Sequence, residues 1–356
     1  MTMGAHTRQE RLRGRLTALD AEGGALVVAA VACVVGAVLS LPFFWGRTLP
    51  IAGPGSVSQL TAIVAGVVAV AAYLVGRLFH RRGLTPFGDR QGTDPRPVAR
   101  IDTFDTLVIA VAHGVIALLG CTVLGSVLAD GFTDATVYFL SATALAAVAV
   151  AITAYVTFLS ATGMNLMRLS TVLAAFAVIG LLAAMLSAPD PHWWQLHLSA
   201  LGMTNSVSSL TFNITLIVAG LMMTAIARYA TDVRGIDDPE HRAASVRLRV
   251  CLILVGVLLA CVGIFPLDVS RILHNVSAVG MLITFALVVF WVRKALPAAP
   301  TAFFVFGYVS FAVIVIMVVF FAIGYYVLTA TELVAGGIIF GWLVVYLRVT
   351  GAERRE

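Results

Sequence analysis

The segment AFFVFGYVSFAVIVIMVVFFAIG, residues 302–324, decides the fold class because it contains no charged residue. Crossing the hydrocarbon core of a bilayer takes about 20 apolar residues in an α-helix that rises about 1.5 Å per residue. The segment therefore predicts a transmembrane helix. The whole chain agrees, since it is 60% hydrophobic and only 12% charged, with a mean hydropathy of +0.99. This composition excludes a soluble domain.

Nine further segments have the same apolar character. The ten predicted spans cover residues 25–45, 57–79, 104–128, 135–159, 170–187, 206–228, 250–266, 275–292, 302–324 and 331–348. Backbone polar groups in lipid must bond within each helix, so the chain is expected to form an all-α polytopic helix bundle. The first span is longer than the apolar region of about 7–15 residues that a cleaved signal carries, and we expect it to remain.

The basic residues predict the orientation of the bundle. All but two of the 23 Lys and Arg residues fall in one alternating set of connections and in the two terminal tails. The exceptions are Arg47 and Arg271. Because short cytoplasmic segments carry the excess of positive charge, both termini are expected in the cytoplasm. The same rule, together with attraction to anionic lipid, explains the net charge of +5 without nucleic-acid binding.

The connections suggest a division of the chain. We expect a basic cytoplasmic tail over 1–24, a two-helix membrane hairpin over 25–79, and a Pro/Gly/Arg-rich cytoplasmic loop over 80–103. An eight-helix membrane domain over 104–348 and a short cytoplasmic tail over 349–356 follow. In the last span, Gly337 and Gly341 form a Gly-x-x-x-Gly step, a pattern that permits close helix packing.

Two polar stretches mark the predicted outer ends of spans. One begins at His192 and runs to Asn213, and the other runs from Gly263 to Ala278. Helical spacing puts Asn205, Ser209 and Asn213 on one face of the sixth span, and Ser270, His274 and Ser277 on one face of the eighth. Since polar groups in lipid need partners, these two stripes are expected to face each other. Hydrogen bonding between helices, with no further role, would also explain them.

The outer cation Arg271 suggests a ligand. It lies between Asp268 and His274, and a guanidinium beside Asn and Ser donors suits a phosphate oxygen, although a local Asp268–Arg271 ion pair is the alternative. The predicted ligand-binding residues are Ser199, Asn205, Ser209, Asn213, Ser270, Arg271, His274, Asn275 and Ser277. For an acid/base role the candidates are His197, His274 and Asp268.

The outer histidines His192, His197 and His274 are the residues that would hold a metal ion, and zinc is the metal that such ligands suit. The five-residue spacing of His192 and His197 places them on different sides of a helix, and no His-Glu-x-x-His pattern is present. We therefore predict neither a metal site nor a cofactor. His113, near the middle of the third span, is expected either to relay protons or to bond a neighbouring helix as a neutral group. The middles of the spans carry no acidic or basic residue, which argues against an ion-coupled pump.

These outer stretches also carry a family resemblance. The run from Leu198 to Gly202, followed by Phe212–Leu221, resembles the bacterial membrane family called domain of unknown function (DUF) 998. The Gly263–Pro266 run, with His274, Asn275 and Ala278 after it, does so too. The likeness covers about 190–290, at most 104–292, and leaves out the first two and last two spans. More remotely, the chain looks like the Frag/DRAM/Sfk group.

The resemblance implies an integral protein of the bacterial plasma membrane without an assigned activity. In such relatives an acidic residue often follows the Ser, whereas here Ala200 stands at that position. The remote group's association with membrane lipids favours a lipid-related role.

We expect the protein to bind or organise lipid at the outer ends of the sixth and eighth spans, without a covalent step. An alternative is an intramembrane hydrolase or transferase that acts on a lipid or lipid-linked glycan through His197 or His274. A transporter with a cavity lined by His113 and the Asn213 stripe is another. The expected partners are membrane lipids and no nucleic acid, and a homo-oligomer or a membrane-protein partner stays open.

Overall fold

The computed structural model describes residues 3–82, 103–231 and 238–353, and the side chains of 3–19, 81–82 and 352–353 lie outside that description. Several predicted features therefore lie outside the described residues. They are most of the 80–103 loop, the part of the sixth-to-seventh connection that contains Arg234, the basic side chains of the N-terminal tail, and the last three residues.

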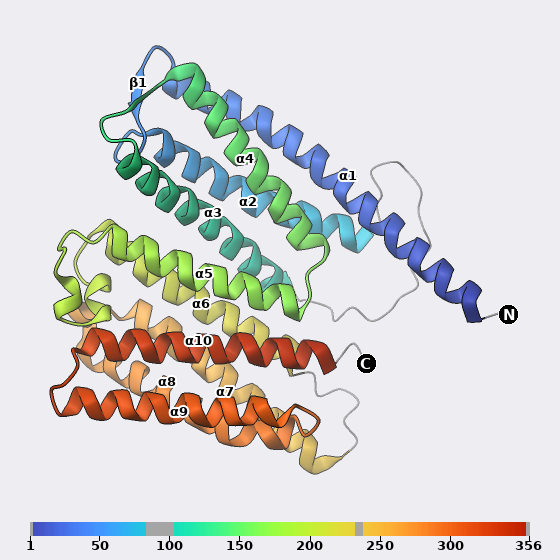
Figure 1. Ribbon diagram of the computed structural model, residues 1–356, viewed down its shortest axis with the longest axis vertical. Helices are drawn as coiled ribbons and strands as arrows, with labels where there is room; N and C mark the ends of the chain where they lie inside the picture. The colour runs from blue at the N-terminus through green and yellow to red at the C-terminus, as the bar shows by residue number, and fades with distance from the viewer. Residues whose placement is uncertain (1–2, 83–102, 232–237, 354–356) are drawn as a thin grey trace. The chain divides into compact units, whose positions relative to one another are not determined.

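The described chain is almost entirely helical, as Figure 1 shows. The elements are α1 (Met3–Phe44), β1 (Thr48–Pro50), α2 (Val57–Arg82), α3 (Thr103–Gly131), β2 (Thr136–Tyr138), α4 (Phe139–Thr162), α5 (Leu166–Leu186), the 3₁₀ turns η1 (Trp193–Gln195) and η2 (Leu198–Gly202), α6 (Val207–Ala230), α7 (Pro239–Ile264), α8 (Leu267–Ala295), α9 (Thr301–Ala322) and α10 (Leu328–Glu353). Within the described residues, ten helices are long and apolar enough to cross a membrane. The predicted all-α polytopic bundle is confirmed.

Hydropathy placed the starts of α7 and α8 too late, because the first turns of these helices are polar. α7 begins at Pro239 instead of residue 250, and the side chain of Asp238 accepts hydrogen bonds from the backbone N–H groups of Glu240 and His241. A carboxylate cap followed by proline is a strong start signal. α8 begins at Leu267 instead of 275, but it is interrupted at Ser270, where φ is −156° and ψ is 95°. Ser270 Oγ accepts from the N–H of Leu273 at 3.4 Å and restarts the helix.

The chain divides into two compact units. Unit 1 comprises residues 1–102 and 113–164, in which α4 packs against α1 and α2. Small residues make this contact close. A Cβ atom added to Gly76 would lie 2.8 Å from the Cβ of Ala161. The short strands β1 and β2 pair in antiparallel register, with Thr48 opposite Tyr138. In the described residues α4 thus belongs with the first two helices, whereas the sequence grouped it with the later ones.

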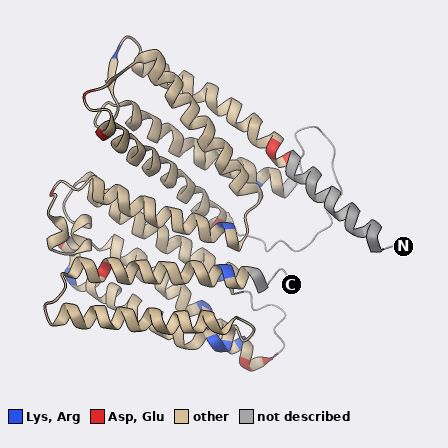
Figure 2. Cartoon of the chain, viewed as in Figure 1, with Lys and Arg blue, Asp and Glu red and all other residues tan. Residues whose placement is uncertain are grey.

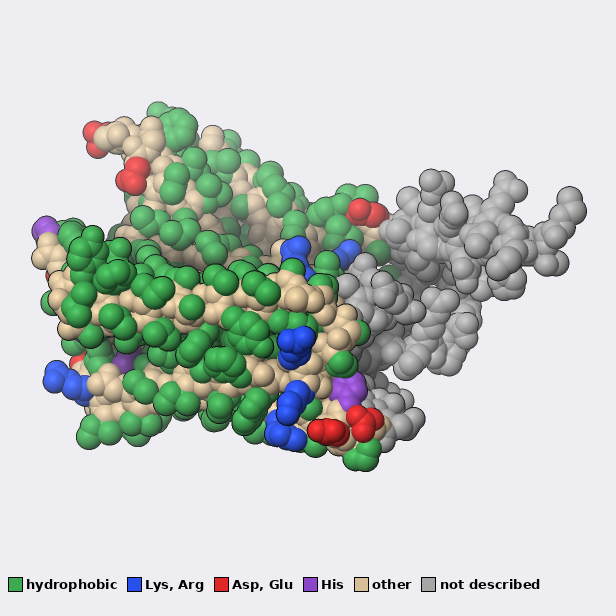
Figure 3. Space-filling view, turned by 60° about the horizontal axis from the view of Figure 1, so that its bottom comes forward, with side chains coloured by type: hydrophobic (Ala, Val, Ile, Leu, Met, Phe, Trp, Pro, Cys, Tyr) green, Lys and Arg blue, Asp and Glu red, His purple; other side chains and the backbone are tan. Residues whose placement is uncertain are grey.

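Unit 2 comprises residues 103–112 and 165–356. α6 packs between α5 and α7, α7 also contacts α8, and α10 contacts α5 and α9. Figure 3 shows hydrophobic side chains along the helices of this unit, with charged side chains nearer the helix ends. Such an apolar outer surface suits a lipid environment.

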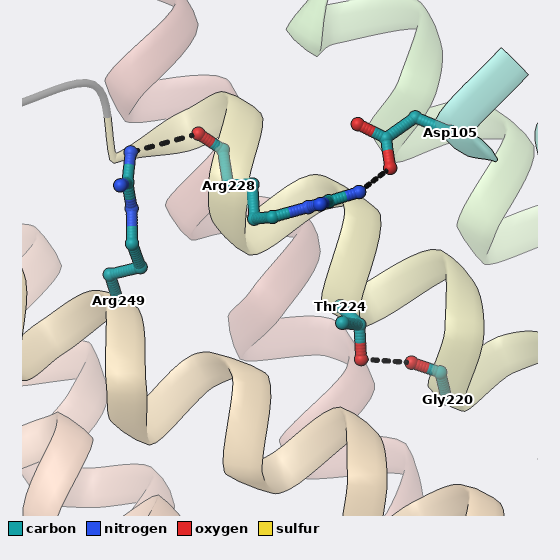
Figure 4. Close-up of polar contacts among 5 residues, drawn as sticks. All are labelled: Asp105, Gly220, Thr224, Arg228 and Arg249. Atoms are coloured by element: carbon teal, nitrogen blue, oxygen red, sulfur yellow. Dashed lines mark hydrogen bonds and ion pairs between the residues drawn. The ribbon is translucent and has the colours of Figure 1, made fainter. Parts of the chain in front are cut away.

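Lys and Arg side chains gather at one end of the helices of unit 2 (Figure 2). We call this the inner end, following the charge rule, and the end that carries Arg271 the outer end. At the inner end an ion pair joins Arg228 of α6 to Asp105 of α3 (Figure 4). Arg249 of α7 donates to the backbone carbonyls of Arg228 and Thr231, which lie where α6 ends. These contacts satisfy carbonyl groups that a helix end leaves without intrahelical partners.

A close helix contact in unit 2 lies between Gly220 of α6 and Gly256 of α7. A Cβ atom on Gly256 would lie 2.6 Å from the carbonyl oxygen of Gly220 and 2.8 Å from Oγ1 of Thr224. That hydroxyl donates to the same carbonyl at 3.0 Å (Figure 4). In contrast, added Cβ atoms on Gly337 and Gly341 would meet nothing within 4 Å. The Gly-x-x-x-Gly step of the last span therefore makes no close helix contact in the described chain.

We predict that Gly256→Ala destabilises the protein by about 1–3 kcal/mol, because the added methyl group forces α6 and α7 apart. The matched control Gly341→Ala places its methyl group in open space and should be neutral or stabilising by up to about 1 kcal/mol, as alanine is the better helix former. Thermal unfolding of both variants in one detergent measures the difference. Equal melting temperatures would show that the α6–α7 contact is not tight.

Candidate functional site at the outer end of unit 2

The outer end of unit 2 is organised around the short turn η2. The chain leaves α5 at Leu186 and does not enter α6 until Val207. Within this connection, η2 contacts α6, α8 and α10. The turn therefore brings the polar residues of one loop against three helices from distant parts of the sequence.

The hydroxyl of Ser199 in η2 lies between a histidine and a carboxylate. Ser199 Oγ is 3.1 Å from Nε2 of His274 in α8 and 3.2 Å from Oε1 of Glu332 in α10. Oε2 of Glu332 accepts a hydrogen bond from the backbone N–H of Leu198. Both Ser199 and His274 are buried, with exposed fractions of 7% and 4%.

The other nitrogen of the imidazole fixes which ring atom faces the serine. Nδ1 of His274 lies 3.0 Å from the carbonyl oxygen of Phe265, which can only accept a hydrogen bond. Nδ1 therefore carries the proton, and in the neutral ring Nε2 is an acceptor directed at Ser199. This bond ties the histidine to the junction between α7 and α8 and holds the ring in one orientation.

The hydroxyl of Ser199 has one hydrogen and two neighbours, so both of its side-chain hydrogen bonds form together only if His274 or Glu332 carries a proton. If Glu332 holds it, the carboxylic acid donates to Ser199 and the hydroxyl of Ser199 donates to Nε2 of His274. If His274 holds it, the imidazolium donates to Ser199 and the hydroxyl donates to the carboxylate. Both arrangements satisfy every hydrogen bond with the same number of protons. The same heavy-atom positions therefore suit either arrangement of the proton.

Glu332 is the residue that the sequence reasoning missed. It is an isolated acidic residue in the first turns of the last helix, and it lies 133 positions from Ser199. Neither helical spacing nor a local motif connects the two. One signal was present, since an ionisable residue inside a predicted span suggests a function. The acid that the family resemblance led us to expect at position 200 is alanine, and the carboxylate beside Ser199 comes from α10 instead.

The two predicted polar stripes do not bond each other in the described chain, and both meet η2 or the loop around it. Asn213 of α6 donates through Nδ2 to the carbonyl oxygen of Gly202 at 3.0 Å, and its Oδ1 is buried without a hydrogen-bond partner among the described residues. Ser209 is used in the capping box of α6 with Ser206. Asn205 is exposed.

In the eighth span, too, some of the predicted residues are bonded or buried and others are exposed. Asp268 accepts from the backbone N–H of Thr204 at 3.0 Å and makes no ion pair with Arg271 among the described residues. Ser277 is buried one turn beyond His274, while Arg271 and Asn275 are exposed. Arg271 and Asn275 are four residues apart, and so they lie on the same side of α8.

The other histidines lie apart from the Ser199 cluster or are engaged elsewhere. His192 is exposed and lies 3.6 Å from Asp190. His197 is half-buried, and its Nδ1 has no hydrogen-bond partner among the described residues. His197, His274 and Asp268 thus make no hydrogen bond or ion pair with one another among the described residues. No group of three or more His, Cys, Asp or Glu residues in the described chain is placed to hold a metal ion.

His113 belongs to unit 1. Its Nε2 lies 2.9 Å from Oγ of Ser160, and its ring lies against Tyr73 at a centroid distance of 4.7 Å. The bond to a neighbouring helix is one of the two outcomes expected for this residue.

The ten apolar helices define an integral, multi-pass membrane protein. A family model described as "Protein of unknown function (DUF998)" matches residues 171–349. The chain belongs to this family. No curated protein and no solved structure matches it.

The family match corresponds closely to unit 2. It begins within α5 and extends to residue 349, so it includes α9 and most of α10, which the sequence resemblance left out. Ser199, His274 and Glu332 all lie inside it. The site is therefore formed entirely by the part of the chain that defines the family, whereas α1–α4 lie outside the match.

Burial, and after it the positive charge of Arg271, hold the pKa of His197 below its usual range. A histidine whose pKa falls on folding is neutral at pH 7, and it costs stability as the pH drops below about 6.5, where the unfolded chain binds the proton first. We predict that Arg271→Gln raises the pKa of His197 toward its ordinary value, since only burial then acts on it. The pH dependence of hydrogen–deuterium exchange at the imidazole C2 position, followed by mass spectrometry, measures this shift.

Arg271→Lys is the matched control, because it keeps the charge and should leave the exchange profile of His197 unchanged. An identical profile in the Gln variant would mean that Arg271 does not act on this histidine.

Proposed function

We propose that the outer end of unit 2 is an intramembrane acyl-transfer site, a lipid hydrolase or transferase in which Ser199 is the nucleophile and His274 the general base. The observation that supports it is the 3.1 Å contact between Ser199 Oγ and a histidine nitrogen whose tautomer is fixed by Phe265. A nucleophile within hydrogen-bond reach of a base that a third group orients is the arrangement that activates serine.

In the proposed reaction, Ser199 Oγ attacks the carbonyl carbon of an ester while Nε2 of His274 accepts the hydroxyl proton. The ester C–O bond then breaks, and His274 returns the proton to the leaving alcohol. Water or an acceptor alcohol attacks the acyl group on Ser199, with His274 again taking and returning one proton. Glu332 is a positioning residue, which orients η2 through Leu198 and the serine through its hydroxyl.

The surroundings favour a lipid substrate. The serine lies at the outer end of helices whose sides are apolar, and only 7% of its surface is exposed. A water-soluble ester has little access to such a position, whereas an ester within the bilayer lies at the correct depth. On the same helix as His274, exposed Arg271 and Asn275 offer donors to an anionic or polar headgroup. The acyl chain reaches Ser199 only if η2, a five-residue turn, shifts.

Binding of lipid without a covalent step would use the same exposed donors, Arg271 and Asn275. It is the function that the sequence alone favoured. Lipid binding alone does not explain why the hydroxyl of Ser199 lies within hydrogen-bond distance of Nε2 of His274. The transporter alternative rests on His113 and Asn213, whose side chains are engaged in hydrogen bonds to Ser160 and to the carbonyl oxygen of Gly202. We therefore favour the acyl-transfer site.

We predict that a fluorophosphonate probe labels Ser199 in the detergent-solubilised protein, since these reagents react with a serine that an adjacent base activates. Peptide mass spectrometry locates the adduct. His274→Ala should slow labelling by about a hundredfold or more, the usual contribution of a general base. Ser170→Ala is the matched control: this buried serine bonds the carbonyl oxygen of Met167 at the start of α5 and makes no hydrogen bond with η2 in the described chain, so labelling should persist.

Glu332→Gln tests the contribution of the Glu332 carboxyl group. It should slow labelling less than His274→Ala and move the pH dependence of the labelling rate, because an amide cannot exchange a proton with Ser199. An unlabelled Ser199 in a protein that melts at its normal temperature, or equal labelling in the His274→Ala variant, would rule out the acyl-transfer proposal.

A further inference from the structure

Unit 1 contains a cavity that belongs to neither the Ser199 cluster nor unit 2. It has a volume of about 170 Å³ and lies where α1 ends and α2 begins. Its walls are Phe43, Leu60 and Ile63, and its polar lining includes Arg47 and Gln59. We call it the Arg47 groove.

The backbone around the groove is held in place by turns that need glycine. Gly46 has φ of +67°, a conformation that side chains disfavour, and this turn lets the N–H of Arg47 bond the carbonyl oxygen of Phe44 at 3.0 Å. Gly55, with φ of +73°, donates its N–H to Oε1 of Gln59 at 2.7 Å. Because Oε1 is occupied, the amide nitrogen of Gln59 remains as a donor toward other groups.

Arg47 is a cation without a partner in the described chain. It is exposed, and its guanidinium makes no ion pair or hydrogen bond with any described residue, including Asp130 and Asp134 in the next outer connection. By the charge rule Arg47 lies on the outer side, where only one other of the chain's basic residues is found. An unpaired cation there, beside an amide donor, is suited to an anionic oxygen.

The walls of the groove indicate that its occupant is partly apolar. Phe43 is 61% exposed and Ile63 is 51% exposed, and both belong to helices that are long and apolar enough to span a membrane. These side chains lie on the surface that contacts lipid. The cavity has room for a headgroup-sized portion of a molecule, roughly the volume of five or six waters, so a chain attached to it must continue along Ile63 into the bilayer.

We propose that the Arg47 groove binds one anionic phospholipid of the outer leaflet, with the headgroup phosphate on Arg47 and Gln59 and an acyl chain along Phe43, Leu60 and Ile63. The phosphate neutralises the unpaired cation, and the chain covers the exposed wall. This site lies in unit 1 and does not depend on the acyl-transfer proposal for unit 2.

The test uses the full-length protein in phosphatidylcholine vesicles that contain phosphatidylglycerol with a diazirine near the start of one acyl chain. After illumination, peptide mass spectrometry locates the crosslinks. We expect them in residues 43–63, reduced by excess unlabelled phosphatidylglycerol. Arg47→Gln should lower crosslinking of this segment about tenfold or more, as loss of a charged hydrogen bond predicts.

Two further variants separate the groove from general lipid contact. Ile63→Trp fills the groove from a half-exposed position and should lower crosslinking of the same segment while the charge stays. Arg271→Gln removes the other outer cation and should leave it unchanged.

Crosslinking of residues 43–63 that is insensitive to Arg47→Gln would overturn the proposal. So would equal competition by phosphatidylcholine, which would remove the role of the anionic charge. Equal competition by inorganic phosphate would show that the lipid chain contributes nothing.

Discussion

The rest of the structure depends on one constraint: inside a bilayer, every backbone N–H and C=O group needs a partner within the protein. Ten helices meet it over most of the described chain. The small residues at helix contacts, Gly220 and Gly256 above all, then let these helices approach until backbone atoms nearly touch. Where the chain leaves the helices at the outer end of unit 2, the constraint has to be met by side chains.

That need explains most of the polar residues near η2. Glu332 accepts from the N–H of Leu198, Asn213 donates to the carbonyl of Gly202, and Asp268 accepts from the N–H of Thr204. Each of these side chains stabilises a short irregular segment that has no regular hydrogen bonding of its own. Their presence at membrane depth therefore requires no ligand.

The contact between Ser199 and His274 is different, because it joins two side chains and satisfies no backbone group of η2. Burying such a pair costs free energy unless its hydrogen bonds are complete. Here the single hydroxyl hydrogen lies between two acceptors, so both hydrogen bonds form together only if His274 or Glu332 carries a proton. An apolar pair at the same positions would pack without that requirement. For this reason we attach the proposed chemistry to Ser199 and His274, and assign the residues around them a supporting role.

How much of the fold and of the site could be predicted depends on the distance along the chain over which each sequence pattern acts. Hydropathy acts over about 20 residues, so it located ten spans, and it missed the polar first turns that begin at Pro239 and Leu267. Helical spacing acts over one or two turns, so it grouped Asn213 with Ser209 and His274 with Ser277, but it could not indicate that Asn213 bonds Gly202 and His274 contacts Ser199. Neither signal reaches across the 133 positions between Ser199 and Glu332, and neither indicates which glycines lie at a close contact.

The orientation of the spans in the membrane does not explain the two outer cations, Arg47 and Arg271. The charge rule is satisfied by the cations at the inner ends, and it would be satisfied equally well if Arg47 and Arg271 were glutamine. Both are exposed, and neither has an ion-pair partner among the described residues. Arg47 borders a groove with apolar walls, and Arg271 lies one turn from His274. A cation kept on the disfavoured side without a protein partner is better explained by an anionic group that the membrane supplies.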